Sequence, residues 1–250
     1  NIDGLLFSNN IFWECDRHGA GVQVSIASPI GSGIHLLHNL LRAETPGATV
    51  LRFGDSLLTA AQANRRFGSS ASPSRCVGNI DDDPRFADAA NRDFRIDGKS
   101  ACVDAGLPLT TAFGAGKGRR LTVVDALPFY DGFGIEGEQG DWIAVGAGDN
   151  LAQVEKVEFH YYRPDVLVLD REMEWKDGAP VSLPWSGKAP DLGPYEAGMG
   201  ANAALAARAM PAIARPGESV RFACDASAGA RLEWNFGDGA RSAEREPEHA

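Results

Sequence analysis

The stretch GNIDDDPRFADAANRDFRIDGKSACVDAG, residues 78–106, decides the fold class. Its apolar residues are single anchors separated by Asp, Asn, Gly and Pro: Ile80, Phe86, Phe94, Ile96 and Val103. A helix would repeat its apolar residues every three or four positions, whereas isolated anchors between turn-forming residues are typical of short strands joined by tight turns. We therefore expect a β structure in which this stretch closes a stack of strands.

The residues before this stretch contain a loose repeat. NIDGLLFSNNIFW (1–13) and GIHLLHNLL (33–41) each combine a short apolar strand with an asparagine, Asn10 or Asn39, and ATVLRF (48–53) adds a third strand-like run. A single coil cannot bury its apolar side, but stacked coils share one core. Asparagine at a coil corner tolerates a left-handed backbone and can bond to the equivalent asparagine of the next coil. Two ordinary turn asparagines are the alternative.

The segment SLLTAAQANRR (56–66) interrupts this repeat. Its residues Leu57, Leu58, Ala61 and Ala63 lie near helical spacing, which predicts a short helix on the surface of the stack.

The composition changes after residue 107. TTAFGAGKGRR (110–120) is rich in glycine but lacks the GxxxxGK[ST] spacing of a phosphate loop, so we expect a linker. Five short strand candidates follow at the spacing of a small antiparallel barrel or sandwich: 121–124, 142–145, 154–159, 166–169 and 181–183.

The end of the chain has its own pattern. Residues 197–211 are rich in Ala and Gly and predict a linker with helical character. The next two segments, 216–224 and 231–239, alternate as strands, with Val220 and Phe222 on one face and the apolar residues of the second strand facing inward, namely Leu232, Trp234 and Phe236.

Three groups of motifs resemble known families. An Asp-Pro-x-Phe-x-Asp element (83–88), an Asp-Phe-Arg-Ile strand (93–96) and a Ser-x-x-x-Asp-Ala-Gly turn (100–106) resemble the C-terminal end of right-handed parallel β-helix proteins of the pectate-lyase-like superfamily. Gly-Asp-Trp-Ile (140–143) and Ala-Pro-Asp-Leu-Gly-Pro-Tyr-Glu (189–196) resemble the small β module that follows the solenoid in many bacterial β-helix proteins, with Pro194 in place of the usual Ala. Trp-Asn-Phe-Gly-Asp-Gly (234–239) with Pro-Glu-His (247–249) looks like a PKD domain, an immunoglobulin-like β-sandwich.

These resemblances imply an all-β protein with three parts. Residues 1–109 would be the last coils of a right-handed parallel β-helix, 110–196 a small antiparallel β-barrel-like module, 197–211 a linker and 212–250 a truncated PKD domain. About 40 residues of a sandwich of roughly 100 cannot bury a complete core. Because the chain begins at Asn1 and ends inside a motif, we expect it to be a fragment of a longer protein.

Composition excludes several classes of function. The net charge of −10 disfavours a nucleic-acid partner, and no run of about 18 apolar residues could span a membrane. The four cysteines have no CxxC spacing, which disfavours a zinc site. Cys76 and Cys102 flank the closing stretch and are either a disulfide in an exported protein or two buried thiols.

The chain contains few candidates for a chemical site. Asp16, Arg17 and His18 combine a carboxylate, a cation and an imidazole in one loop and are the catalytic candidates, with a solvated loop as the alternative. Trp175, Trp185 and Tyr195 are candidates for binding sugar rings, although packing of the β module also explains them. The triplet Asp81–Asp83 lacks the glycine and glutamate of an EF-hand, so a turn is expected, no metal site is assigned, and calcium is left open only as a cofactor of a longer protein.

Taken together, the resemblances imply a secreted or cell-surface bacterial protein. Our leading hypothesis is the C-terminal fragment of a β-helix protein that binds and cleaves extracellular polysaccharide, as a lyase or glycoside hydrolase with its catalytic coils before Asn1. The fragment alone is then expected to be inactive. The alternative is a non-catalytic surface or adhesion protein with a β-helix stalk.

Overall fold

The computed structural model describes residues 4–15, 21–26, 33–45, 47–197, 207–210, 215–224 and 232–250. The secondary structure is almost entirely β, as the strand patterns predicted. The chain divides into two compact units, Asn1–Ala197 and Gly198–Ala250, which are described separately.

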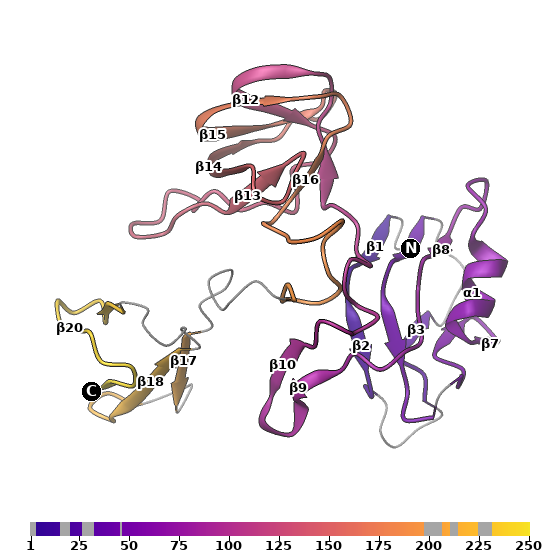
Figure 1. Ribbon diagram of the computed structural model, residues 1–250, viewed down its shortest axis with the longest axis horizontal. Helices are drawn as coiled ribbons and strands as arrows, with labels where there is room; N and C mark the ends of the chain where they lie inside the picture. The colour runs from indigo at the N-terminus through magenta and orange to yellow at the C-terminus, as the bar shows by residue number, and fades with distance from the viewer. Residues whose placement is uncertain are drawn as a thin grey trace. The chain divides into compact units, whose positions relative to one another are not determined.

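Three sets of parallel strands build the first part of the larger unit (Figure 1). The strands are β1 (Leu5–Ser8), β2 (Ile11–Trp13), β3 (Val24–Ile26), β4 (Ile34–Leu37), β5 (Leu40–Arg42), β6 (Leu51–Phe53) and β8 (Arg75–Val77). β1 pairs with β4 and β4 with β8, β2 pairs with β5, and β3 pairs with β6. The chain therefore visits three sheets in the same order and returns to the first, so that successive turns of the chain stack as rungs. The predicted stacking of residues 1–13 on 33–41 is confirmed.

Alternation along these short strands places the core between the three sheets. Leu36, Leu41, Val50 and Leu51 are fully buried, whereas His35 is only half-buried on the opposite face of β4. Each rung contributes only a few apolar side chains, so the core is continuous only because the rungs stack.

A row of asparagines, of which Asn39 and Asn79 are buried, joins the rungs at one corner. The side chain of Asn10 donates to Asn39 Oδ1 at 3.1 Å, and that of Asn39 donates to Asn79 Oδ1 at 3.0 Å. The row ends at Asn64, whose Oδ1 accepts from Asn79 Nδ2 at 3.0 Å. The predicted bond between Asn10 and Asn39 is confirmed.

The left-handed backbone at this corner lies one residue earlier than the sequence suggested. Positive φ angles occur at Asn9 (60°), His38 (52°) and Gly78 (65°), each directly before an asparagine of the row. The left-handed residue turns the chain, and the following asparagine then points into the stack.

A helix lies on the surface of the stacked rungs, as predicted, but it begins at Ala60 and not at Ser56. Helix α1 (Ala60–Phe67) lies beside β8 (Figure 1) and begins after Thr59, which forms a capping box with Gln62. The residues before it form strand β7 (Ser56–Leu58), which pairs antiparallel with β6. Among the described residues no helix is long and apolar enough to cross a bilayer.

The stretch at residues 78–106 forms a hairpin rather than another rung. Strands β9 (Phe86–Asp88) and β10 (Asp93–Ile96) pair antiparallel around the 3₁₀ turn η1 (Ala89–Asn91). Ile80 forms a parallel bridge with Leu40 and so continues the stack before the hairpin begins.

Residues 110–182 form an antiparallel half-barrel. Its strands are β11 (Thr110–Thr111), β12 (Gly116–Val123), β13 (Trp142–Val145), β14 (Leu151–Glu158), β15 (Asp165–Trp175) and β16 (Pro180–Ser182). They follow the order β11-β16-β13-β14-β15-β12, and a bridge between Ala112 and Val123 brings the two edges together. All five predicted strands are confirmed.

The linker predicted at residues 110–120 is wrong, because this segment contains β11 and half of β12. Gly116 pairs with Trp175 on β15, and a Cβ atom at Gly116 would lie 2.7 Å from the indole ring. Gly118 has a φ of 135° next to a register shift between Gly118 and Arg120. Glycine is therefore required here for close approach and for a bulge, and does not indicate a loop.

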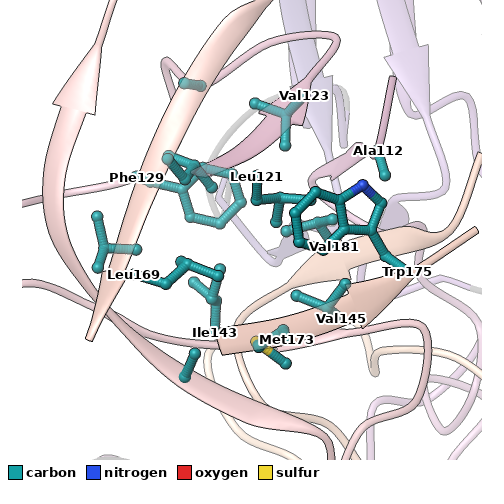
Figure 2. Packing of buried hydrophobic residues seen from close by; sticks show 14 of the residues in the cluster. Ala112, Leu121, Val123, Phe129, Ile143, Val145, Leu169, Met173, Trp175 and Val181 are labelled. Atoms are coloured by element: carbon teal, nitrogen blue, oxygen red, sulfur yellow. The ribbon is translucent and has the colours of Figure 1, made fainter. Parts of the chain in front are cut away.

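Figure 2 shows the core of the half-barrel. Leu121 from β12, Ile143 from β13 and Leu169 from β15 are fully buried and point into one cluster together with Phe129 and Trp175. Inward-facing residues of all the long strands meet there, so this part of the chain has a core of its own.

The described residues of the smaller unit form five short strands. They are β17 (Ala207–Met210), β18 (Val220–Cys224), β19 (Trp234–Asn235), β20 (Arg241–Ser242) and β21 (Glu248–His249). β18 pairs with β17 and with β21, so the linker predicted at 197–211 is wrong for residues 207–210. The rest of that prediction, residues 198–206 and 211, lies outside the described residues.

The aromatic residues of the smaller unit gather as their alternation predicted. The ring of Phe222 lies 5.8 Å from that of Trp234 and 5.1 Å from that of Phe236. The imidazole of His249 stacks on Phe236 at 4.2 Å and contacts Asp238 Oδ2 through Nε2 at 2.9 Å.

Cys15, Cys76, Cys102 and Cys224 are free thiols, which excludes the disulfide considered above. Cys76 belongs to the core of the rungs, and Cys102 belongs to the cluster beneath the hairpin. Burial raises the pKa of the Cys76 thiol to about 11, and burial also raises the pKa of Cys102.

These environments predict selective thiol modification. Exposed Cys15 should react with iodoacetamide within minutes at pH 8, whereas Cys76 and Cys102 should stay unmodified until the larger unit unfolds, because a thiol that is buried and protonated is a poor nucleophile. Mass spectrometry of peptides labelled with and without urea measures this difference. Equal labelling of Cys15 and Cys76 in native protein would contradict it.

Candidate functional site

A groove with a volume of about 710 Å³ lies between strand β2 and the hairpin of β9 and β10. Its apolar and aromatic lining consists of Ile11, Phe12, Trp13, Phe86, Phe94 and Pro194. Asn9, Asn10, Cys15 and Gly193 complete it. Both the size and the predominance of apolar side chains are those of small-ligand sites.

Strand β2 directs its side chains to two sides. Phe12 packs with the core of the rungs, while Ile11 packs on the outer face with Leu40 of the next rung. Trp13 lies in register with Arg42 on that outer face. The groove is consequently built on the outer face of the sheet formed by β2 and β5.

Three aromatic rings form the wall of the groove. The ring of Phe86 lies 5.4 Å from that of Trp13 and 5.2 Å from that of Phe94, and both pairs pack edge to face. Phe94 is 39% exposed and Trp13 is half-buried. Edge-to-face packing holds the rings in fixed orientations and leaves part of their surface open to a ligand.

Two asparagines supply the polar part of the groove. Asn9 is fully used, because its Nδ2 donates to Leu107 O at 2.6 Å and its Oδ1 accepts from Leu107 N at 2.8 Å. Asn10 donates to Ser8 O and to Asn39, whereas its Oδ1 accepts no hydrogen bond within the described part of the chain. The groove therefore presents an acceptor at Asn10.

Gly193 and Pro194 belong to the lining of the groove. The amide of Gly193 donates to Asn9 O at 2.8 Å, and its φ is 94°. A Cβ atom at Gly193 would lie 2.8 Å from Ile11 Cδ1, so only glycine allows this segment to pass so close to β2.

Three carboxylates hold the segment that carries Gly193. Asp191 accepts from the amides of Asp104 (2.7 Å) and Ala197 (2.6 Å), and Glu196 accepts from the amide of Asp191 at 2.8 Å. Asp104 in turn accepts from the amide of Lys188 at 2.6 Å. These are the acidic residues of the Ser-x-x-x-Asp-Ala-Gly and Ala-Pro-Asp motifs, so their role here is to bind backbone amides.

Burial raises the pKa of Asp191 and of Glu196, and their backbone hydrogen bonds only partly oppose it. The folded state therefore binds these two protons more tightly than the unfolded state does. Both groups contribute their full stabilisation at a pH below their ordinary pKa values of 3.8 and 4.5. This stabilisation is lost as the pH rises through the raised pKa values of the folded state. We expect Asp191→Asn and Glu196→Gln to reduce this loss of stability with rising pH. Urea unfolding across the pH range measures it.

A residue with the opposite shift provides the control. The amide of Val157 donates to Asp131, which lowers the pKa of that carboxyl, so its contribution is present above the ordinary value of 3.8 and is lost as the pH falls. Asp131→Asn should therefore change the pH dependence in the opposite sense. The same change of slope in all three variants would contradict the assignment.

The predicted catalytic residues Asp16, Arg17 and His18 lie outside the described residues. Cys15, which precedes them directly, lines the groove. Among the described residues no group of three or more His, Cys, Asp or Glu side chains could hold a metal ion. Asp81 instead accepts from Arg42 Nη1 at 3.3 Å and from the amide of Gly47 at 2.8 Å, both distant in sequence. Asp83 Oδ1 accepts from the amide of Arg85 at 2.8 Å, which is a local turn contact.

Two of the three predicted sugar-binding residues are buried, and the third is half-buried. Trp175 is 9% exposed, packs on Gly116 and donates from Nε1 to Gly114 O at 3.2 Å. Trp185 is 6% exposed, and Tyr195 is half-buried. The sequence reasoning missed Trp13 altogether, and treated Phe86 and Phe94 as strand anchors. The sequence signal for Phe86 and Phe94 was that they are isolated aromatic residues in a stretch rich in Asp and Asn.

Comparison with known proteins found no matching family model, no similar curated protein and no similar solved structure. The chemistry of the groove is therefore the basis for assigning a function.

Proposed function

We propose that residues 1–109 are the final coils of a right-handed parallel β-helix, that 110–196 form the β module that follows such a solenoid, and that 212–250 belong to a PKD domain. The parallel pairing of successive rungs and the row formed by Asn10, Asn39 and Asn79 support the first assignment. The antiparallel half-barrel supports the second, and the contacts of Phe222 with Trp234 and Phe236 support the third.

We propose that the protein is the C-terminal part of a secreted bacterial protein that binds an extracellular polysaccharide in the groove. The observation that carries this proposal is the wall of Trp13, Phe86 and Phe94, whose rings are fixed by edge-to-face contacts and partly exposed. One face of a sugar ring consists of C–H groups, which gain by covering an aromatic surface, while its hydroxyl groups keep contact with water or with an acceptor such as Asn10 Oδ1.

Cleavage of the bound polysaccharide is the second part of the proposal. A lyase needs a base and a cation, and a hydrolase needs two carboxyl groups across the scissile bond. We assign this chemistry to coils of a longer protein, with Asp16, Arg17 and His18 as the candidates in this chain. The apolar lining of the groove also suits the second candidate function, a surface or adhesion protein that binds sugar without cleaving it.

Binding can be tested with single tryptophan variants. Trp13→Ala should weaken binding of the preferred polysaccharide about tenfold, since truncating an aromatic anchor costs more than about 1 kcal/mol. Trp142→Ala is the matched control, because Trp142 is 43% exposed on the half-barrel and does not line the groove. Affinity electrophoresis in gels containing alginate, pectate, glycosaminoglycans or acetylated xylan measures binding. Unretarded migration in every polymer would disprove the proposal.

A further inference from the structure

We propose that the groove binds a neutral polysaccharide whose sugars carry apolar substituents, such as acetyl groups or the methyl groups of deoxy sugars, in preference to an acidic polysaccharide. This inference rests on the proposed function and specifies the class of sugar for the same groove. It follows from the charge, the shape and the polar groups of the lining.

Among the described residues, the lining offers no cation to a charged sugar. Each lining side chain named above is uncharged. Arg95 follows Phe94 on β10, but its guanidinium is matched by Asp93, with Nε to Oδ1 at 2.8 Å and Nη2 to Oδ2 at 2.5 Å. A uronate carboxylate entering this groove would lose water without gaining a cation from these residues.

The apolar residues provide more than flat ring surfaces. Ile11 and Pro194 line the groove together with the three aromatic rings. The flat face of an unsubstituted sugar is matched by aromatic rings alone, whereas a methyl or acetyl group can also cover aliphatic surface and remove it from water.

The polar part of the groove suits a hydroxyl group. Asn10 Oδ1 is an acceptor on the lining and can accept from a sugar hydroxyl. Asn10 O accepts from Leu40 N at 2.9 Å, and Glu14 N donates to Arg42 O at 2.8 Å, so these main-chain groups of β2 pair with β5 and do not face the groove.

A set of three ligands tests the inference with the full chain. The ligands are an acetylated xylo-oligosaccharide, the same oligosaccharide after removal of its acetyl groups by alkali, and an oligogalacturonate of similar length. By isothermal titration calorimetry we expect the acetylated form to bind at least tenfold more tightly than either of the others. Phe94→Ala should remove this preference, whereas Trp142→Ala should leave it unchanged.

A gain of binding keeps the test independent of losses caused by misfolding. Pro194→Lys places a cation at an exposed position of the lining and should raise the affinity for oligogalacturonate about tenfold. Oligogalacturonate binding as tightly as the acetylated ligand to the unaltered protein would overturn the inference and leave polysaccharide binding intact. An unchanged affinity in Pro194→Lys would also overturn it, because the ligand would then lie elsewhere. Failure of all polysaccharides to bind would instead remove the proposed function.

Discussion

Replacing Asn39 by alanine is expected to lower the free energy of unfolding of the larger unit by about 4 kcal/mol, because each buried polar group left without a partner costs about 1–3 kcal/mol. Asn39 is fully buried. Its Oδ1 accepts from Asn10 N at 3.0 Å, and its Nδ2 donates to Phe7 O and to Asn79 Oδ1, both at 3.0 Å. Alanine would remove the partner of Asn10 N and one donor to Phe7 O, whereas Asn79 Oδ1 would keep its hydrogen bond from Asn39 N at 3.1 Å. Urea unfolding monitored by circular dichroism measures the loss.

Two further variants separate the hydrogen bonds from other effects of the substitution. Asn91→Ala removes an exposed asparagine whose side chain binds only Asp88, and it should change stability by less than about 0.5 kcal/mol. Asn39→Asp keeps the acceptor but loses the donor and buries a carboxyl group, so the variant should become less stable as the pH rises and that group ionises. Equal effects of Asn39→Ala and Asn91→Ala would show that the row of asparagines contributes nothing.

The strands that could be predicted are those whose apolar residues alternate locally. The strand Trp142–Val145 has the predicted bounds, and Leu121, Val154 and Val181 lie in strands where the pattern placed them. Pairing between neighbouring rungs was also predictable, because Asn10 and Asn39 occur in similar sequences. Asn79 was not predictable as a member of the row, since α1 is inserted between it and the preceding rung and breaks the spacing.

The errors arose where a partner far away in the chain decides the structure. Gly116 belongs to a strand because the indole of Trp175 occupies the space where a side chain would lie, and no local pattern reveals that. Strand β17 has the sequence ARAM, in which two of the four residues are alanine, so it lacks a clear strand pattern and forms because β18 offers an edge. Intrinsic β-propensity is weak compared with such pairing.

The candidate groove was the least predictable feature. Trp13 and Phe86 are far apart in the sequence, and only the packing of the hairpin beside β2 brings their rings to 5.4 Å. Trp175 and Trp185 were selected by residue type alone, which does not reveal burial. The carboxylates Asp104 and Asp191 were recognised through motifs, but their role in binding backbone amides depends on the fold of a segment far from Asp104 in sequence.

Replacing Gly140 by alanine is expected to destabilise the half-barrel by about 3 kcal/mol, because forcing extra atoms into a packed region typically costs about 1–3 kcal/mol and more when backbone must move. A Cβ atom at Gly140 would lie 1.9 Å from Val154 O and 3.1 Å from Tyr130 O. Both are backbone atoms, so no side-chain rotation can relieve the clash. The amide of Val154 also donates to Asp141 O at 2.9 Å, so relief requires β13 and β14 to separate.

Two other glycines isolate this steric effect. A Cβ atom at Gly98 would have no atom within 4 Å, and Gly98 has no left-handed φ, so Gly98→Ala should change stability by less than about 0.5 kcal/mol. Gly137 has equally open surroundings but a φ of 87°, so Gly137→Ala should cost only the left-handed strain of about 1–2 kcal/mol. Hydrogen exchange of the amides of β13 and β14 should accelerate in Gly140→Ala alone. If Gly140→Ala and Gly137→Ala lost the same stability, backbone conformation would explain both, and the close approach of Gly140 to Val154 would not be a constraint on the fold.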